Sequence, residues 1–233
     1  MNKSIRYKAL HKRLNCRNPD AIIEDIETYS FDSYELERAY LYLDELTRKE
    51  INWVHPEHSL YPSAFLKMKE PPLFIEYVGQ PSWTTCELFS VVGARKLHPL
   101  SQQWIDTEFV QFLTKHPRTA VVSGGAFGVD LRAHLAAIKS EIPTLVILPC
   151  GLGEIYPKHL YDLQSEILKY GGAYLSEFEF SQGVKKSNFF FRNRLIAGLG
   201  KICLVIQANV KSGTMLTVHH ALENGRPIFT LPA

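Results

Sequence analysis

The chain has 233 residues, of which 45% are hydrophobic and 21% charged, and its net charge is +2. These values are typical of a globular protein and exclude a disordered or fibrous chain. No apolar run approaches the roughly 18 residues of a membrane-spanning helix, and the polar N-terminus lacks a signal-peptide core. We therefore expect a cytoplasmic protein. Because the net charge is small, any nucleic-acid site must concentrate its cations locally.

The first 50 residues predict a small helical module. Asn18-Pro19-Asp20 is a helix-start signal, and residues 34–46 carry apolar side chains at helical spacing. Residues 49–85 form a connecting region that is rich in proline and aromatic residues and includes one short expected strand, residues 73–77. We therefore expect two parts, a helical module at 1–50 and a second domain at 51–233.

From residue 86 onward, short apolar runs alternate with longer helical patterns. Strands that are apolar along almost their whole length, separated by helices, are typical of a parallel sheet covered on both faces. The sequence therefore predicts an α/β fold with a doubly wound, mostly parallel sheet. The expected strands are residues 88–92, 119–122, 144–148, 173–175, 202–206 and 228–231, and the expected helices are 100–114, 129–139, 159–169, 190–197 and 214–222.

The four cysteines, Cys16, Cys86, Cys150 and Cys203, form neither a Cys-x-x-Cys pair nor a zinc-like spacing. Cys86, Cys150 and Cys203 lie beside or within apolar runs. We interpret them as reduced core residues, which is the usual role of a free cysteine. The sequence thus predicts no metal site.

Small, hydroxyl-bearing or basic residues follow four of the expected strands. In a doubly wound sheet, ligands bind at the carboxyl ends of the strands, so these residues predict an anion site at one edge. The loop at 123–128 is the strongest element, because glycines permit close approach and the next helix offers free N–H groups to a phosphate. Alternatively, the glycines serve only a tight turn. The segments are Gly93-Ala94-Arg95-Lys96, Ser123-Gly124-Gly125-Ala126-Phe127-Gly128, Pro149-Cys150-Gly151 and Lys211-Ser212-Gly213-Thr214.

This glycine pattern does not predict a cofactor. The order Gly-Gly-x-x-Gly differs from the Gly-x-Gly-x-x-Gly of an NAD site, no acid follows the next strand for a ribose, and no Gly-Lys-Ser/Thr completes a P-loop. Asp130 stands where it can cap the next helix or favour its dipole. His134 lies one turn later, and with no nucleophile or ligand cluster nearby we expect packing or hydrogen bonding from it. We therefore expect no cofactor and no catalytic residue.

Residues 185–194 combine four cations, Lys185, Lys186, Arg192 and Arg194, with three consecutive phenylalanines. Cations neutralise phosphates and aromatic faces stack bases of any sequence, so this composition predicts binding of single-stranded nucleic acid. Alternatively, the phenylalanines are core and the cations form a solvated face. Three adjacent helical positions cannot all face inward, so at least one phenylalanine should lie near the surface.

Taken in order, these blocks resemble the DprA/Smf family of DNA-processing proteins from about residue 53 to the end. The resemblance implies an extended Rossmann-like fold that binds single-stranded DNA, protects incoming DNA in natural transformation and helps load the RecA recombinase. It leaves a homodimer open. The blocks are Val91–Arg95, Ser123–Asp130, Ala133-His134, Cys150-Gly151, Tyr156-Pro157, Ser176-Glu177, Arg192–Leu199, Ser212-Gly213-Thr214 and Gly225-Arg226.

Carried over by position, the resemblance implies that Arg95 is the phosphate-contacting arginine after the first strand and that Ser123, Gly124 and Gly125 line the floor of the pocket. These residues and those predicted from the strand ends and from residues 185–194 form the predicted DNA-binding set. The set is Arg95, Lys96, Ser123, Gly124, Gly125, Lys185, Lys186, Phe190, Arg192, Arg194, Lys211, Ser212 and Gly213.

Two other functions stay open at this point. The first is a nucleotide-binding or nucleotide-hydrolysing protein related to the "lonely guy" enzymes, of whose motif Ser212-Gly213-Thr214 is a partial echo. The second is an interaction module that has lost DNA binding, against which Arg95, Arg192 and Arg194 argue.

Overall fold

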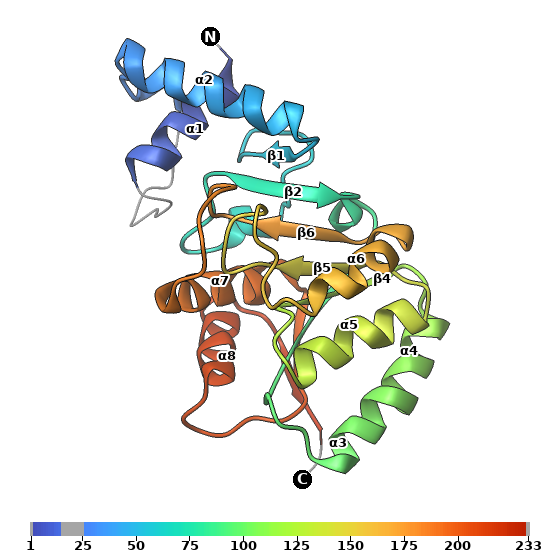
Figure 1. Cartoon of the computed structure of the whole chain (residues 1–233). Helices are drawn as coiled ribbons and strands as arrows, with labels where there is room; N and C mark the ends of the chain where they lie inside the picture. The colour runs from blue at the N-terminus through green and yellow to red at the C-terminus, as the bar shows by residue number, and fades with distance from the viewer. Residues whose placement is uncertain (1, 15–25, 232–233) are drawn as a thin grey trace.

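The computed structural model describes residues 2–14 and 26–231 (Figure 1). Its N-terminal part contains two helices that pack on each other, α1 (Lys3–Arg13) and α2 (Ser33–Arg48), with a short 3-10 helix, η1 (Ile26–Thr28), between them in the chain. A capping box of Asp32 and Glu35 starts α2. The expected N-terminal helices are thus confirmed, whereas Cys16 and the helix-start signal at residues 18–20 lie outside the described residues.

The described strands form one eight-stranded sheet in the order β1-β2-β6-β5-β4-β3-β7-β8. The six strands from β6 to β8 are parallel, while β1 is antiparallel to β2 and β2 to β6. The doubly wound, mostly parallel sheet is therefore confirmed. The bounds are β1 (Asn52–Val54), β2 (Ile75–Gly79), β3 (Glu87–Val92), β4 (Thr119–Ser123), β5 (Thr144–Ile147), β6 (Ala173–Ser176), β7 (Ile202–Val205) and β8 (Ile228–Thr230).

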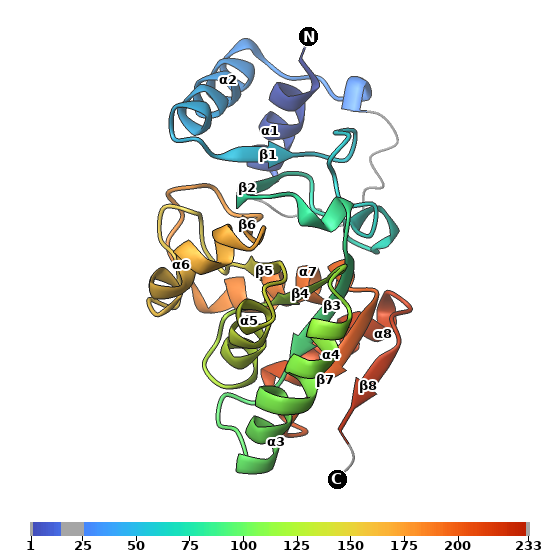
Figure 2. The same cartoon turned by 90° about the vertical axis from the view of Figure 1, so that its right-hand side faces the viewer.

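Helices cover both faces of the parallel strands (Figures 1 and 2). Successive strand residues point to opposite faces, so Val121 packs in the core beneath α5 and Val122 in the core beneath α7. The helices are α3 (Pro99–Trp104), which continues through the π-helical turn η4 (Ile105–Phe109) into α4 (Val110–Lys115), then α5 (Val129–Lys139), α6 (Leu160–Lys169), α7 (Lys186–Leu199) and α8 (Gly213–Glu223). Two short 3-10 helices, η2 (Phe65–Lys67) and η3 (Ser82–Thr84), precede β3.

The strand order reverses at the centre of the sheet. β3 pairs with β4 on one side and with β7 on the other. The chain adds β4, β5 and β6 in turn, and then returns to add β7 and β8 beyond β3. The loops that follow β3 and β7 therefore leave in opposite directions and open a crevice at the carboxyl edge, which is where ligands bind in doubly wound sheets.

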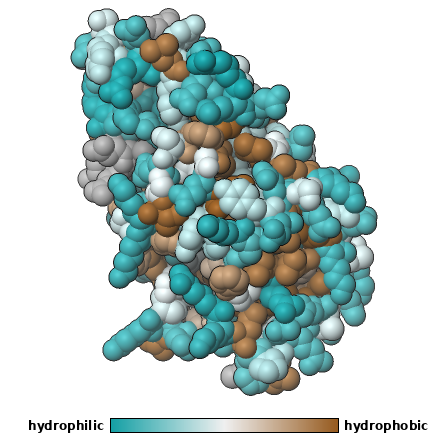
Figure 3. Space-filling model, in the orientation of Figure 1, coloured by the Kyte–Doolittle hydropathy of each residue, from teal (hydrophilic) through white to brown (hydrophobic). Residues whose placement is uncertain are grey.

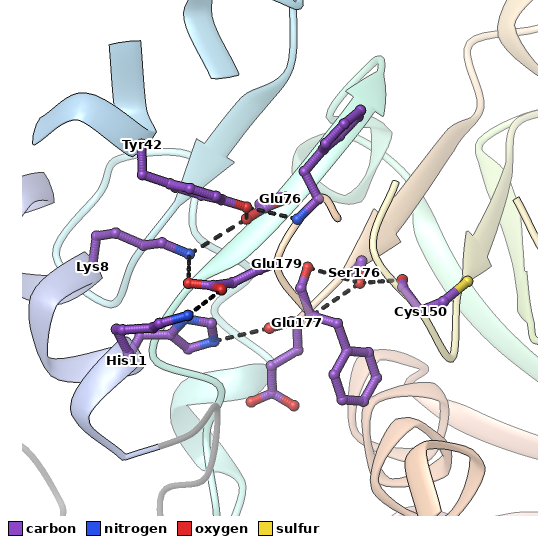
Figure 4. Close-up of polar contacts among 11 residues, drawn as sticks. Lys8, His11, Tyr42, Glu76, Cys150, Ser176, Glu177 and Glu179 are labelled. Carbon is purple, nitrogen blue, oxygen red and sulfur yellow. Dashed lines mark hydrogen bonds and ion pairs between the residues drawn. The ribbon is translucent and has the colours of Figure 1, made fainter. Parts of the chain in front are cut away.

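Buried ion pairs hold the N-terminal helices on the antiparallel side of the sheet (Figure 4). Lys8 of α1 is 1% exposed, and its ammonium lies 3.5 Å from the Glu76 carboxylate of β2 and 3.4 Å from that of Glu179. Tyr42 of α2 donates a hydrogen bond of 2.6 Å to Glu76. Burial raises the pKa of Glu76 to about 7, although Lys8 and Tyr42 oppose that rise. Each charge of this network depends on its partners, because an unpaired buried charge is costly.

Apolar packing continues the same contact. Leu43 and Leu46 of α2 share one buried cluster with Leu73 and Phe74, which lie just before β2. The helices thus pack on residues that follow position 50, and the division into 1–50 and 51–233 stays a prediction. In the space-filling view, the N-terminal helices present a mostly hydrophilic surface, whereas hydrophobic residues are more frequent over the layers below (Figure 3).

The three described cysteines are free thiols. Cys150 and Cys203 are buried and Cys86 is half-buried. Burial raises the pKa of Cys150 to about 12 and that of Cys203 to about 11, so both thiols are protonated at neutral pH. They occupy the core positions that the sequence predicts for them.

Candidate nucleic-acid interface

A cavity of about 780 Å³ opens at the crevice between the ends of β3 and β7. The segments after β3, β4, β5 and β7 and one side of α7 line it, so five segments far apart in the sequence meet there. Its main polar, charged and aromatic lining residues are Arg95, Lys96, Asp130, Tyr156, Lys186, Phe189, Phe190, Arg192, Asn193, Gln207, Asn209, Ser212 and Thr214. The predicted edge of the sheet is therefore the edge that carries the cavity.

Most members of the predicted DNA-binding set meet at this cavity. Arg95, Lys96, Lys186, Phe190, Arg192, Ser212 and Gly213 line it, and Gly124 lines a smaller adjoining hollow together with Arg95 and Arg192. Arg95, Gly124 and Arg192 thus lie together, as the prediction of a common rim requires. Ser123, Gly125, Lys185, Arg194 and Lys211 line neither space.

Three exposed cations surround the cavity. The side chains of Arg95, Lys96 and Lys186 reach solvent, and none of them forms an ion pair within residues 2–14 and 26–231. The one acidic lining residue is Asp130. Three cations that form no ion pair with a described acidic residue can neutralise phosphates at this rim.

Arg192 supplies a fourth cation, held beneath the rim. It is 4% exposed, and its Nη1 donates hydrogen bonds to the carbonyl oxygens of Gly124, at 2.8 Å, and Ile147, at 2.6 Å. Burial lowers the pKa of Arg192 to about 10, so the guanidinium stays charged at neutral pH. Arg192 therefore contributes charge to the cavity while its position is fixed by the ends of β4 and β5.

Arg192 also explains the glycine at position 124. A Cβ there would lie 2.0 Å from Arg192 Nη1. The sequence predicts that the glycines of this loop permit close approach of a ligand. At Gly124, the group that approaches closely is the guanidinium of Arg192. Gly125 and Gly128 adopt φ angles of +70° and +86°, which favour glycine, and a Cβ on Gly125 would meet the side chain of Leu160.

Asp130 lies in the first turn of α5, close to this guanidinium. The N-cap of α5 is Gly128, and no described side chain caps the helix, so the predicted cap is not formed, whereas an acidic group in the first turn agrees with the predicted effect on the helix dipole. Burial raises the pKa of Asp130 to about 6, and the nearby Arg192 opposes that rise. His134, one turn along, hydrogen-bonds the Thr144 hydroxyl at 2.7 Å, as expected of a packing residue. Asp130 is thus a carboxylate at neutral pH and becomes neutral in mild acid.

Two predicted pocket residues belong to the core instead. The Ser123 side chain is fully buried, and its hydroxyl donates a hydrogen bond of 2.6 Å to the Val91 carbonyl oxygen, between β4 and β3. Arg194 forms a buried ion pair with Glu177 at 2.5 Å. Two positions along a helix are about 200° apart, so Arg192 and Arg194 face opposite sides of α7. The expectation that Ser123 and Arg194 face the ligand is therefore wrong.

The remaining members of the set are peripheral. Lys185 is exposed at the N-cap of α7, and Lys211 is exposed in the loop between β7 and α8. Gly125 turns the chain beside Leu160 rather than at the cavity. These residues lie near the same edge but outside the cavity wall, so their contribution to binding stays a prediction.

The aromatic side chains are divided between surface and wall. Phe190 is 52% exposed at the cavity, which confirms that at least one of the three phenylalanines reaches the surface. Phe189 also lines the cavity, with its ring edge-to-face with Tyr156 at a centroid distance of 5.9 Å. The sequence reasoning missed Phe189 and Tyr156 as site residues, although both stand within segments that it had singled out.

The cavity also faces the start of α8. This helix begins at Gly213, after Ser212, whose hydroxyl is buried and has no partner among the described residues. The Thr214 hydroxyl donates to the Gly93 carbonyl oxygen at 3.0 Å and ties this turn to the end of β3. The first N–H groups of a helix and a free hydroxyl are donors that suit a phosphate.

The fold and this crevice define a Rossmann-like protein with a basic, aromatic-lined cavity at the switch point of its sheet. The chain belongs to the family of DNA recombination-mediator protein A, whose model matches residues 52–233. The predicted resemblance to DprA/Smf proteins is thus confirmed.

Individual relatives agree with this assignment. Protein Smf of Borreliella burgdorferi is 31% identical over 218 residues, which cover 88% of this chain and 67% of that protein. The solved structure of DNA processing protein A from Helicobacter pylori, described for its single-stranded DNA binding mode, has a TM-score of 0.69 at 33% identity and covers 78% of this chain and 81% of its own. DprA from Streptococcus pneumoniae has a TM-score of 0.70 at 26% identity, covering 100% and 82%.

The chain spans 49% to 67% of the length of the first curated relatives that it matches. Among the described residues, no helix is both long enough and apolar enough to cross a membrane.

Proposed function

We propose that this chain binds single-stranded DNA, with no preference for sequence, in the cavity at the carboxyl edge of its sheet. The observation that carries the proposal is the meeting of three unpaired cations, Arg95, Lys96 and Lys186, with the Phe190 ring around one cavity. Cations take the phosphates and the ring stacks a base. The Helicobacter pylori relative, whose structure concerns single-stranded DNA, supports the same ligand.

Fluorescence anisotropy with a labelled oligothymidylate of about 20 nucleotides tests this proposal. We expect binding that weakens as salt rises, and a slope of log affinity against log salt that is smaller by about 0.7 in Arg95→Ala, because one phosphate contact is lost. Arg118→Ala is the matched control, since Arg118 is an exposed arginine just before β4, at the opposite edge of the sheet. No binding at low salt, or equal losses in the two variants, would refute the proposal.

We further propose that the bound DNA is incoming DNA in natural transformation and that the chain helps to load RecA on it. The family's description as a recombination mediator supports this role. The test is RecA-dependent ATP hydrolysis on DNA already covered by a single-strand-binding protein. Addition of the chain should shorten the lag, and Arg95→Ala should not. An unchanged lag with a chain that binds DNA would refute RecA loading alone.

A homodimer is the oligomeric state that we propose. In support, β8 ends the sheet with β7 as its described neighbour, and its Phe229 is 54% exposed, as is typical of an edge that another chain can cover. Light scattering of the wild-type chain should give twice the chain mass, and Phe229→Lys should give the monomer mass. A monomer in both would refute the dimer.

A further inference from the structure

Phe127 is an aromatic side chain that the cavity does not use. It lies in the turn between β4 and α5 and is 61% exposed, although a phenylalanine ring usually gains stability by burial. Its turn contains Gly125 and Gly128, both with positive φ, and the Gly128 carbonyl oxygen accepts a hydrogen bond from the Arg132 N–H. The ring is therefore presented from a well-defined turn.

A second ring supports Phe127 from below. The His159 ring lies 4.3 Å from it between centroids, tilted by 45°, and His159 Nε2 donates a hydrogen bond of 2.9 Å to the Gly125 carbonyl oxygen. That carbonyl belongs to the same turn as Phe127, so the histidine and the turn fix each other. One side of the Phe127 ring is thus against the imidazole, while the side chain keeps most of its surface exposed.

A small hollow joins Phe127 to the proposed DNA cavity. It has a volume of about 70 Å³, and its wall shares Arg95, Arg192, Tyr156 and Phe189 with the main cavity. With about 70 Å³ against about 780 Å³, this hollow is a minor recess beside the main cavity. A base next to it can lie over the exposed ring of Phe127.

Arg95 lies where the two spaces meet. It lines both of them, is exposed and forms no ion pair within the described ranges. A phosphate held by this guanidinium would have one neighbouring nucleotide on the side of Phe190 and the other on the side of Phe127. Arg95 thus shares one space with each of the two aromatic side chains, and such an arrangement suits the alternation of bases and phosphates along a single strand.

We propose that Phe127, supported by His159, is a second base-stacking platform that extends the DNA path beyond the main cavity. This proposal rests on the proposed function and adds to it a specific residue and a longer footprint. The stacked base belongs to a nucleotide that directly adjoins the phosphate on Arg95. The platform accepts any base, because only ring faces are in contact.

The test compares Phe127→Ala with the wild-type chain on thymidine 5′-monophosphate and on oligothymidylates of about 3 to about 12 nucleotides. We expect the variant to bind the monophosphate, whose single base can stack on only one ring, nearly as the wild type does, and to lose about tenfold or more on the oligomers, since one stacked base is lost. Phe127→Trp should restore the affinity. Tyr34→Ala, which removes an aromatic that is 63% exposed on α2, is the matched control and should change nothing.

A spectroscopic readout locates the platform. The fluorescent base 2-aminopurine is placed at each position of the longer oligomer in turn, and stacking on a ring quenches it. The positions that reach Phe127 should be quenched with the wild type and brighter with Phe127→Ala. Equal affinity of Phe127→Ala and wild type at every length, or equal losses on the monophosphate and the oligomers, would overturn the platform while binding that depends on Arg95 stands. Absence of wild-type binding would instead refute the proposed function.

Discussion

The ion pair of Arg194 and Glu177 gives the sharpest test of the division between structural and DNA-binding cations. Arg194 Nη2 lies 2.5 and 2.6 Å from the two carboxylate oxygens of Glu177, and the two side chains are 7% and 3% exposed. Arg194→Met keeps most of the side-chain volume and removes the charge. Glu177 then lies buried without its cation.

Removing one partner of a buried pair costs about 3–5 kcal/mol. At a urea m value of about 2 kcal/mol per M, the unfolding midpoint should fall by about 1.5–2.5 M. Burial raises the pKa of Glu177 and Arg194 lowers it, so the pKa rises further in the variant. A folded pKa above the unfolded value favours the native state at low pH, so the cost should shrink as the pH falls towards the unfolded value.

Urea unfolding followed by circular dichroism measures this loss, and anisotropy on the folded fraction measures DNA affinity. We expect Arg194→Met to lose stability and to keep wild-type affinity. The double variant Arg194→Met, Glu177→Gln should recover part of the loss, because no unpaired charge remains. An unchanged urea midpoint combined with a tenfold loss of affinity would refute the structural role and restore the prediction from the sequence that Arg194 contacts DNA.

Three further predictions concern other buried charges. Because the pKa of Asp130 is about 6, the affinity of the wild type for DNA should rise as the pH falls through that value. Asp130→Asn should bind more tightly than the wild type at pH 7.5, and its affinity in anisotropy should depend less on pH. Parallel pH dependences of the two affinities would contradict this. Gly124→Ala should displace the guanidinium of Arg192 and weaken its hydrogen bonds, which lowers the free energy of unfolding by about 1.5–3 kcal/mol and also lowers DNA affinity. Wild-type values in thermal unfolding and in anisotropy would argue against it. The pKa of Glu76 is about 7 in the folded protein against 4.5 as the ordinary value, so the native state loses stability as the pH rises between these values. The free energy of unfolding of Glu76→Gln, taken relative to the wild type, should therefore rise by about 3 kcal/mol from about pH 4 to about pH 8 in urea titrations. A difference that stays constant over this range would count against the shift.

The parallel core was predictable from the sequence because its signals are local and repeated. The helix at Val129–Lys139 has both predicted ends, and each parallel strand differs from its predicted bounds by at most one residue. β1 was missed, since Asn52–Val54 has three residues in a segment rich in proline. β2 begins at Ile75, two residues later than predicted. Leu73 and Phe74 were included in the predicted strand because they are apolar, but their side chains pack against the N-terminal helices just before β2.

The site was predictable as an edge but not as a list of side chains. Glycines and cations after several strands correctly indicate the carboxyl edge, because parallel strands end together there. The direction of each side chain depends on register. Helical periodicity already separates Arg192 from Arg194 by about 200°, and this signal could have removed Arg194 from the set. Nothing comparable in the sequence shows that the Ser123 hydroxyl bonds to Val91, since that contact joins two strands.

The small net charge is consistent with a DNA-binding site because, in the described part of the chain, some basic side chains are paired with carboxylates and others are not. The unpaired ones determine the local charge, whatever the total for the chain. The chain has 26 basic and 24 acidic residues, so its mean charge predicts little. Lys8 and Arg194 lie within 4 Å of buried carboxylates. This separation is shorter than the screening length of about 8 Å at physiological salt, so the opposite charges of each pair largely cancel each other at the surface. Arg95, Lys96 and Lys186 have no such partner in the described ranges and share one rim. The field at the crevice is therefore set by three or four charges, which is why single substitutions there should alter DNA binding more than the same loss of charge elsewhere.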